Sequence, residues 1–378
     1  MLNAIDRRTD RIVYLPALDG VRALAAMGVF CVHLQQNSSI DWSVGPISLQ
    51  QLCINGRVGV AAFFLLTGYL LAAPLWGGKE SSKGSDPALR HFWRRRMIKI
   101  IPLYYAVLIA LTLLHFSQAG NIDWSDVLLH AMFAHNFSPS SLYSISEPMW
   151  ALAVIVQYYL VFWISVSVWA LCRQNSCALF WGFALLASAG WGVTLIVSTG
   201  FSAASSASML IWEHSLPAHL PIFSLGAILA WFARGQIVSR RRIHLCDFLA
   251  LCSVVTLVVL LGTPLAAQLE ERVGRYGYPV IPGLLAVVIY AAVQDGWTKS
   301  IFSRRVLVAV GTISYAIYLI HLPVIKFTKR VLSELHFVDD VPLLLATVAF
   351  LLTSLISLGF VALVENPLRR LVVGRTRE

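Results

Sequence analysis

Three ionisable side chains lie within one apolar, membrane-length stretch near the start of the chain. Residues 18–34 read LDGVRALAAMGVFCVHL and contain Asp19, Arg22 and His33. A helix advances about 100° and about 1.5 Å per residue, so Arg22 and His33 share one face roughly 16 Å apart. Asp19 precedes Arg22 by three residues, within reach of its guanidinium. An imidazole titrates near neutral pH and therefore suits general-base chemistry.

A purely structural explanation of these three residues is also open. An arginine near the membrane surface often extends to the headgroups, and Asp19 would then simply pair with Arg22. A histidine within the hydrocarbon region is harder to explain in this way, because such residues generally mark a functional path. We therefore predict that His33 is a functional residue, on the same polar face of the helix as Asp19 and Arg22.

A second group of polar residues lies in HFWRRRMIKIIPLYY, residues 91–105. It contains Arg95, Arg96 and Lys99, followed by Tyr104. Arginine binds phosphate oxygens bidentately, so clustered basic residues can hold a polyphosphate. Basic residues at a helix end also orient membrane helices, which is the simpler alternative. The cluster is denser than orientation requires, and it predicts an anionic ligand.

A third group lies in VGTISYAIYLIHLPVIKF, which begins at residue 310. Ser314, Tyr318 and His321 are spaced i, i+4 and i+7, so they share one face of a helix. A second histidine within an apolar stretch, accompanied by hydroxyl groups, predicts a polar cavity. For Ser314 alone, a hydrogen bond to the backbone one turn earlier is an equally good explanation.

The composition indicates an all-α membrane protein. Hydrophobic residues make up 58% of the 378 residues and charged residues only 13%, whereas about a quarter of a soluble domain is charged. Apolar runs of about 20 residues can cross a bilayer as helices. The sequence predicts a polytopic bundle of about ten transmembrane helices, at 17–35, 57–76, 98–118, 148–172, 178–199, 217–234, 245–263, 279–295, 306–327 and 342–364. Segment 124–137 is too short and polar to span, so it is expected to be an interfacial helix or a re-entrant loop.

Basic residues predict how the bundle is oriented. Most of the 29 Lys and Arg residues fall in segments on the side of the two termini, and cytoplasmic segments carry such an excess. We expect residues 1–16 and the basic tail 365–378 to be cytoplasmic. The net charge of +10 then reflects orientation and anionic lipid rather than nucleic acid. The apolar run after the N-terminal segment is too long for a cleavable signal peptide, so we expect a retained anchor.

The cysteines give no sign of a metal centre. The six cysteines form no CxxC pair, and no histidine joins them at the spacing of metal ligands. We expect neither a structural disulfide nor a bound metal.

Several of these stretches together resemble one family. LDGVRALAAMGVFCVH resembles the first helix of the acyltransferase-3 family of membrane acyltransferases, whose hallmark is an Arg, ten residues and then a His. Further resemblances occur in family order: FFLLTGYLL, RRMIKIIPLYY, PMWALAVIVQYYL, VGTISYAIYLIHLPV and VENPLRR. They extend from about residue 16 to 370, which implies a single transmembrane domain over residues 1–378.

The resemblance implies an activity. The family transfers an acyl group, usually acetyl, from cytoplasmic acyl-coenzyme A to a carbohydrate hydroxyl on the other side of the bacterial plasma (inner) membrane. His33 would be the general base, with Arg22 and Asp19 on the path of the donor. Coenzyme A would be held by Arg95, Arg96, Lys99 and Tyr104. The residues expected to face the acceptor, a glycan or other hydroxylated molecule, are Trp150, Gln157, Ser314, Tyr318, His321 and Glu365.

This sequence also departs from the family pattern. The family's serine and glutamate after the tryptophan are replaced by Ala151 and Ile155. In PAHLPIFSLG, His219 and Ile222 replace an arginine and a glutamate found in many members. Two family carboxylates are therefore missing, and the candidates to replace them are Glu147, Gln157, Glu213 and Glu365.

Two other functions are consistent with the same features. A transporter or flippase would also contain buried charges and proline-broken helices, although it needs no basic site of the size of coenzyme A. A catalytically inactive family member acting as a scaffold would explain the lost carboxylates. The sequence does not identify the acceptor.

Overall fold

The chain is almost entirely helical wherever its structure is described. The computed structural model describes residues 3–6, 11–38, 40–76, 87–171, 176–200, 206–234, 239–273, 279–335, 342–368 and 370. The basic segments 7–10, 77–86 and 371–378, and the side chains of Arg95 and Arg96, lie outside this description.

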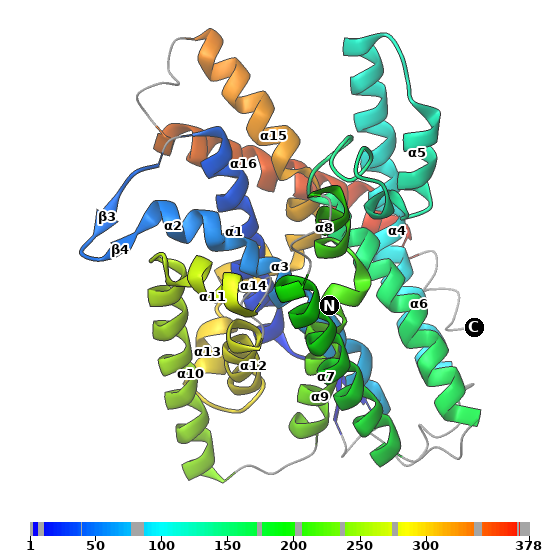
Figure 1. Cartoon of the computed structure of the whole chain (residues 1–378), viewed down its shortest axis with the longest axis vertical. Coiled ribbons are helices and arrows are strands. Elements are labelled where there is room, and N and C mark those ends of the chain that lie inside the picture. The colour runs from blue at the N-terminus through cyan, green and yellow to red at the C-terminus, as the bar shows by residue number, and fades with distance from the viewer. Residues whose placement is uncertain are drawn as a thin grey trace.

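The helices follow one another along the chain, and a longer segment with η3 joins α5 to α6 (Figure 1). They are α1 (Pro16–Asn37), α2 (Leu49–Ile54), α3 (Val58–Ala72), α4 (Pro87–Ala119), α5 (Trp124–Ala131), α6 (Met149–Leu171), α7 (Ser176–Gly200), α8 (Ser206–Glu213), α9 (Leu216–Ala233), α10 (Arg240–Leu261), α11 (Leu265–Val273), α12 (Val280–Ala292), α13 (Trp297–Phe302), α14 (Arg305–Thr312), α15 (Ser314–Glu334) and α16 (Pro342–Phe360). Short helical turns are η1 (Asn55–Arg57), η2 (Ala73–Trp76), η3 (His135–Phe137) and the π-helical η5 (Val361–Glu365).

Within the described residues, four short strands form two antiparallel hairpins. Strand β1 (Asn3–Asp6) pairs with β2 (Arg11–Tyr14), with Asn3 opposite Tyr14, just before α1 begins. Strand β3 (Ser43–Val44) pairs with β4 (Ile47–Ser48) between α1 and α2, and this second hairpin projects from the side of the bundle (Figure 1). The prediction of an all-α protein is confirmed, since the strands are confined to these two connections.

The membrane-spanning helices match the predicted spans with two differences. Among the described residues, eight helical stretches are long and apolar enough to cross a bilayer, or nine if α14 and α15 are one span. The predicted span 306–327 is in fact this pair, bent by 70° at Ile313. The predicted span 279–295 is α12, whose 13 residues are too few to cross a bilayer alone. Segment 124–137 contains only α5 and η3, which confirms that it does not span.

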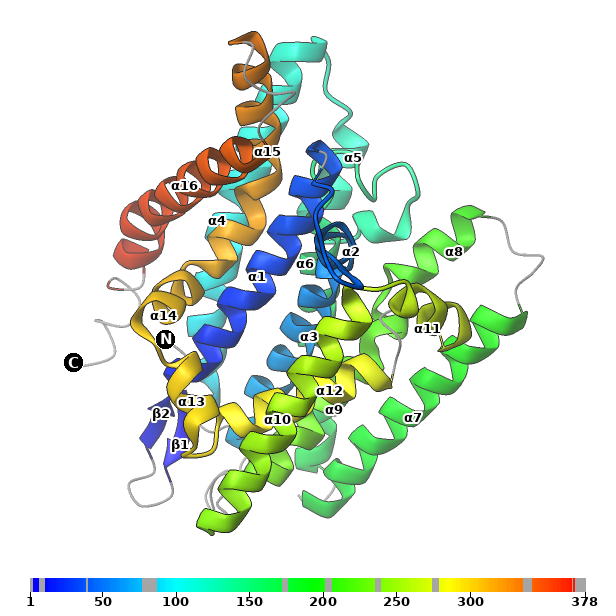
Figure 2. The same cartoon turned by 90° about the vertical axis from the view of Figure 1, so that its left-hand side faces the viewer.

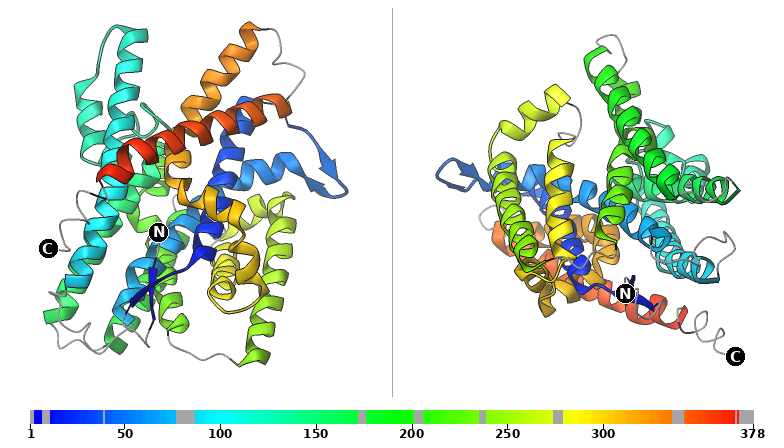
Figure 3. Two further views of the ribbon diagram at one scale, coloured as in Figure 1. Left: turned by 180° about the vertical axis from the view of Figure 1, so that it is seen from behind. Right: turned by 90° about the horizontal axis from the view of Figure 1, so that it is seen from below.

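Helices α1 and α3 occupy the middle of the bundle, as Figures 2 and 3 show. In the apolar stretch of α1, 67% of the residues are buried inside the protein, and in Leu49–Leu75, which contains α3, 83% are buried. In α7 and α16 the buried shares are only 11% and 17%. The outer helices expose large apolar side chains such as Leu185, Leu251 and Leu355. That exposure fits a lipid-facing surface, so the polar residues of α1 are kept away from lipid by the surrounding helices.

Glycines allow α1 to lie this deep. A Cβ added to Gly28 would lie 2.8 Å from the carbonyl oxygen of Gly56, and a Cβ added to Gly56 would meet the carbonyl of Gly28. Nearer the start of α1, Gly20 packs against the carbonyl of Phe302, and Gly311 of α14 packs against the carbonyl of Asp19. Small residues at such crossings are typical of membrane helices, because backbones can then approach closely.

The crossing of α1 with the start of α3 gives a stability prediction. Gly28→Ala should destabilise the protein by about 1–3 kcal/mol, because the added methyl group meets a backbone oxygen that cannot move aside easily. The matched control is Gly182→Ala on α7, where an added Cβ meets nothing within 4 Å. The measurement is thermal unfolding of both variants in the same detergent. A Gly28→Ala variant as stable as Gly182→Ala would contradict the close crossing.

Candidate active site

The N-terminal end of α1 holds a buried carboxylate with two partners. Asp19 is only 1% exposed. Its Oδ2 accepts a hydrogen bond of 2.7 Å from the hydroxyl of Tyr14, and its Oδ1 lies 3.9 Å from Nη1 of Arg22. The predicted pairing of Asp19 with Arg22 is present, and Tyr14 of β2 is a partner that sequence reasoning missed. The three side chains form one polar cluster where the β1–β2 hairpin meets α1.

Lys99 of α4 reaches the same end of the bundle. Its Nζ lies 3.4 Å from the carbonyl oxygen of Thr312, the residue after the glycine that packs on Asp19. Arg95 and Arg96 lie one turn earlier in the backbone of α4. Tyr104 is different: it is fully buried, and its hydroxyl donates to the carbonyl of His130. Tyr104 therefore anchors the segment around α5, and the structure gives no support to its predicted contact with coenzyme A.

His33 lies near the other end of α1, and a neighbour fixes its tautomer. Its Nδ1 is 2.6 Å from Oε1 of Gln36. A carboxamide oxygen only accepts hydrogen bonds, so Nδ1 carries the proton and Nε2 holds the lone pair. Nε2 has no hydrogen-bond partner among the described residues. A buried neutral imidazole with one nitrogen held and the other available is the form that a general base requires.

Glu147 lies beside the same imidazole. Its Oε2 is 3.8 Å from Nδ1 of His33, and its side chain is 37% exposed. A carboxylate on this side stabilises the imidazolium that forms when Nε2 takes a proton. Of the four candidates for the missing carboxylates, Glu147 is the one with a contact to His33 in the described structure. Glu365 instead ends η5, which packs against α4.

His321 of α15 completes this cluster. Its ring centroid is 5.0 Å from that of His33. Its Nδ1 is bound to the carbonyl oxygens of Tyr318 and Ile317 at 2.8 and 3.1 Å, so its Nε2 is also unprotonated. That Nε2 is buried without a hydrogen-bond partner in the described part of the chain. A buried acceptor costs free energy unless it is paired.

The other residues expected to face the acceptor have structural contacts. The hydroxyl of Ser314 donates to the backbone carbonyl of Gly311, one turn earlier, which is the structural alternative given above for this residue. Tyr318 donates to the carbonyl of Pro148 and so fixes the residue next to Glu147. Trp150 packs edge-on against His214, with ring centroids 4.5 Å apart. Gln157 donates to the carbonyl of Phe133 and to Asn136.

The positions that depart from the family pattern lie in a packed apolar region. Ala151 and Ile222 are each 2% exposed, and Ile155 packs against the same core. His219 is buried with its ring centroid 4.9 Å from that of Phe64. A carboxylate at Ile222 would need a partner here, so the substitutions remove charge from this region and leave Glu147 as the carboxylate beside His33.

The polar stripe on α1 is interrupted by an apolar section. Ala26 and Val29 lie on the face shared by Arg22 and His33, and both are buried. Ala26 packs against Ile313 and Ile317, at the bend between α14 and α15. The stripe predicted from spacing is therefore two polar clusters on one straight helix, separated by packed side chains.

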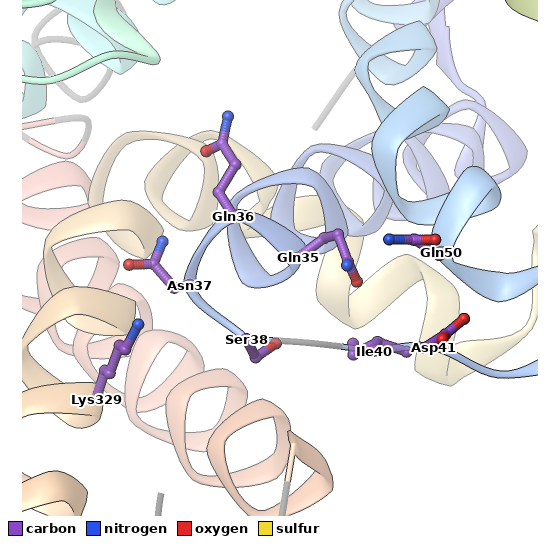
Figure 4. Close-up of a pocket in the computed structure, with 8 residues that line it drawn as sticks. All are labelled: Gln35, Gln36, Asn37, Ser38, Ile40, Asp41, Gln50 and Lys329. Atoms are coloured by element: carbon purple, nitrogen blue, oxygen red, sulfur yellow. The ribbon is translucent and has the colours of Figure 1, made fainter. Parts of the chain in front are cut away.

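A polar pocket lies at the C-terminal end of α1 (Figure 4). Its volume is about 390 Å³. Its lining comes from α1, α2, α15 and the loop after α1, and consists of Gln35, Gln36, Asn37, Ser38, Ile40, Asp41, Gln50 and Lys329. Gln36 belongs to both the pocket and the cluster around His33. His33 thus lies one helical turn from a pocket lined almost entirely by polar residues.

The segment that carries Glu147 is held by several buried polar contacts. Asn136 donates to the carbonyl of His214 at 3.0 Å, and the hydroxyl of Tyr143 lies 2.6 Å from Nε2 of His214. Phe133 adopts the left-handed conformation, with φ of 54°, and Gln157 binds its carbonyl. Strained backbone of this kind is held only where its surroundings fix it.

Comparison with known proteins assigns the chain to a family. Residues 15–363 match the family described as "Acyltransferase domain". The chain belongs to this acyltransferase family. The chain is 27% identical to Acyltransferase MdmB of Streptomyces mycarofaciens over 97% of this chain and 94% of that protein. It is 26% identical to Peptidoglycan O-acetyltransferase OatA of Listeria monocytogenes over 86% of this chain, and 24% identical to O-acetyltransferase OatA of Staphylococcus aureus over 94% of it.

The two O-acetyltransferases are longer proteins. The alignments span 52% of the Listeria protein and 57% of the Staphylococcus protein. No solved structure gives a significant match to the chain. The predicted family is confirmed, and the protein is a multi-pass membrane acyltransferase.

Two histidines near α5 give a prediction about acid stability. His130 and His135 stack in parallel with ring centroids 4.0 Å apart, both fully buried. Burial, and then the neighbouring His130, lower the pKa of His135 to about 3. Burial also lowers the pKa of His130. Both rings are therefore neutral in the folded protein around neutral pH.

Acid should consequently destabilise the fold through this pair. An unfolded histidine titrates near pH 6.5, so the contribution of His135 is complete above that pH and is lost as the pH falls from 6.5 toward 3. For His135 the loss is on the order of 1 kcal/mol per pH unit; His130 contributes in the same direction. His135→Phe keeps a ring against His130 and removes one titration. The fall in melting temperature between pH 7 and pH 5 should be smaller than in wild type, whereas the exposed control His244→Phe should match wild type. Equal falls in all three proteins would contradict the prediction.

Proposed function

We propose that this protein transfers an acyl group, with acetyl as the first candidate, from acyl-coenzyme A to a hydroxyl group of an extracytoplasmic or lipid-linked glycan. The observation that carries the proposal is the cluster of His33, Gln36, Glu147 and His321, which presents an unprotonated imidazole nitrogen beside a polar pocket. The relatives named as O-acetyltransferases, one of them a peptidoglycan O-acetyltransferase, support a glycan as acceptor.

The reaction assigns a role to each group. Nε2 of His33 takes the proton of the acceptor hydroxyl as its oxygen attacks the thioester carbonyl. A C–O ester bond forms, the C–S bond breaks, and the proton passes to the coenzyme A thiolate. Gln36 keeps the imidazole in the required tautomer, and Glu147 stabilises the transient imidazolium. Nε2 of His321 accepts a hydrogen bond from a second hydroxyl of the acceptor.

The donor is proposed to enter from the opposite end of α1. Arg95, Arg96 and Lys99 would hold the phosphates of coenzyme A, and Arg22 with Asp19 would line its path. Under the positive-inside rule this end, with both termini, faces the cytoplasm of a bacterial inner membrane. The thioester must then pass the apolar section at Ala26 and Val29, and a movement at the bend between α14 and α15 would open that section, because Ile313 and Ile317 close it.

The proposed function is tested by incubating the purified protein with labelled acetyl-coenzyme A and candidate glycans. His33→Ala should reduce transfer by about 10²–10⁴-fold, the usual cost of losing a general base. Membrane insertion should be unchanged, and His244→Ala on the exposed part of α10 is the matched control. Transfer at near wild-type rate by His33→Ala would exclude this residue as the base.

Glu147 is proposed as a positioning residue. Glu147→Gln keeps the shape of the side chain and removes its charge, so kcat should fall about ten- to a hundredfold while KM for acyl-coenzyme A stays the same. Glu147→Asp should recover part of the loss. Glu334→Gln serves as a control, because Glu334 pairs only with exposed Arg330 in the described structure. A change confined to KM, or no change at all, would show that Glu147 does not act through His33.

The basic cluster is tested by charge reversal. Arg95→Glu with Arg96→Glu should weaken acyl-coenzyme A binding at least tenfold, because each lost charged contact to phosphate contributes on the order of 1.5–3 kcal/mol. Binding of the acceptor should be unchanged. Topology reporters must accompany the measurement, because removing basic residues can invert a helix. Unchanged donor affinity with correct topology would leave the cluster as an orienting segment.

A further inference from the structure

We propose that the polar pocket at the C-terminal end of α1 binds an uncharged, hydroxyl-rich sugar unit of the acceptor, and that Gln35, Gln50, Asp41 and Lys329 determine this specificity. The inference rests on the proposed function and deepens it, because it names the chemical class of acceptor that the site selects.

The lining has the chemistry of hydroxyl recognition. Four carboxamide groups and one serine hydroxyl surround the pocket, from Gln35, Gln36, Asn37, Gln50 and Ser38. A carboxamide offers both donors and an acceptor, and a sugar hydroxyl needs both. Ile40 is the single apolar residue of the lining, and it also belongs to the buried cluster of Phe30, Leu34 and Ile325. The pocket is therefore polar around the ligand and sealed on one side by packed apolar side chains.

One buried acceptor in the lining has no partner. Oε1 of Gln35 is inaccessible to solvent and makes no hydrogen bond within the described part of the chain. Leaving such an atom unpaired costs about 1–3 kcal/mol. In Figure 4 Gln35 lies in the middle of the lining, and its carboxamide turns down between Gln50 and Ile40. A turn of the Gln35 carboxamide toward the pocket would let a ligand hydroxyl donate to this oxygen and remove the cost, so we expect a hydrogen-bond donor in the ligand.

The two charged residues favour a ligand without net charge. Lys329 lies on one side of the pocket, whereas Asp41 lies on the other side with Gln50 (Figure 4). An anionic sugar attracted by Lys329 would be repelled by Asp41, and an amino sugar would meet the opposite conflict. Both charges can instead bind hydroxyl groups, since an ammonium only donates and a carboxylate only accepts.

The pocket is connected to the catalytic cluster by two helices. On α1, Gln36 binds Nδ1 of His33, and Nδ2 of Asn37 donates to the carbonyl of His33 at 2.7 Å. On α15, Lys329 follows His321 by eight residues, roughly 12 Å along the helix. A volume of about 390 Å³ lies at the small end of the range of ligand sites. It suits a small terminal unit of a glycan, bound so that one of its hydroxyls reaches His33.

The test measures binding separately from transfer. The full-length protein in nanodiscs, without acyl-coenzyme A, is titrated with three tetrasaccharides of equal length: N-acetylglucosamine (neutral), galacturonate (anionic) and glucosamine (cationic). Binding is followed by saturation-transfer NMR. Wild type should bind the neutral tetramer best. Gln35→Leu and Gln50→Leu should each weaken that binding about three- to tenfold, whereas the control Gln268→Leu on the exposed face of α11 should not.

Substitutions of the two charged residues, Asp41 and Lys329, give the sharper test, because each should improve the binding of a charged tetrasaccharide. Asp41→Asn should improve binding of the galacturonate tetramer, and Lys329→Met should improve binding of the glucosamine tetramer. Asp41 is exposed, so its variant should fold even if Gln35→Leu does not. Preference of wild type for a charged tetramer, binding of none of the three, or neutral binding unaffected by the variants would overturn the inference.

The two proposals can fail separately. Neutral-sugar binding that depends on Gln35 and Gln50, with no acyl transfer from labelled acetyl-coenzyme A, would leave the pocket as a sugar site and overturn the proposed function. If acyl transfer occurs but Gln35→Leu and Gln50→Leu leave the acceptor KM unchanged, the proposed function stands and the pocket is not the acceptor site.

Discussion

The arrangement of this protein depends on keeping the ionisable face of α1 out of lipid. A charged or titratable side chain within a bilayer must be enclosed by other helices or by a water-filled space. Gly28 against Gly56, Gly20 against Phe302 and Gly311 against Asp19 bring backbones close enough for that enclosure. The short helices α13 and α14 and the bent start of α15 are packed around α1 as a result, while long apolar helices such as α7 and α16 form the outside.

Enclosure divides the polar residues of α1 into two clusters with different partners. At one end a carboxylate is bound by a tyrosine and lies beside an arginine, with Lys99 nearby. At the other end two imidazoles lie side by side, each with Nδ1 in a hydrogen bond. The section between them is closed by Ala26 against Ile313 and Ile317. This arrangement would suit the proposed reaction, in which the donor and the acceptor approach from opposite ends of α1.

Buried histidines have more than one role in this protein. His33 and His321 form the candidate catalytic cluster, whereas His130 and His135 stack on each other and help to hold the segment that carries Glu147. His214 joins Tyr143 to Asn136 in that same segment. Asp247 is a comparable case among the carboxylates, because it is buried in α10 and accepts hydrogen bonds from the backbone of Trp297 and Thr298 at the start of α13. Burial of a titratable group alone therefore does not identify the site.

The sequence by itself determined the fold class, most of the spans and the family, and it singled out His33, Arg22, Asp19 and His321 as candidate site residues. These are local properties. A run of about 20 apolar residues, or a spacing of eleven residues on one helix, does not depend on which helices lie next to it. Gln36, three residues after His33, could have been found by the same helical spacing. Only the tertiary structure decided that Glu147, and not Gln157 or Glu365, lies beside His33, because that contact joins a loop to a helix far away in sequence. It also decided that Tyr104 and Ser314 bind backbone, that the polar stripe is interrupted at Ala26, and that a polar pocket forms where α1, α2 and α15 meet. Each of these depends on which helices are neighbours, and periodicity along a single helix does not contain that information.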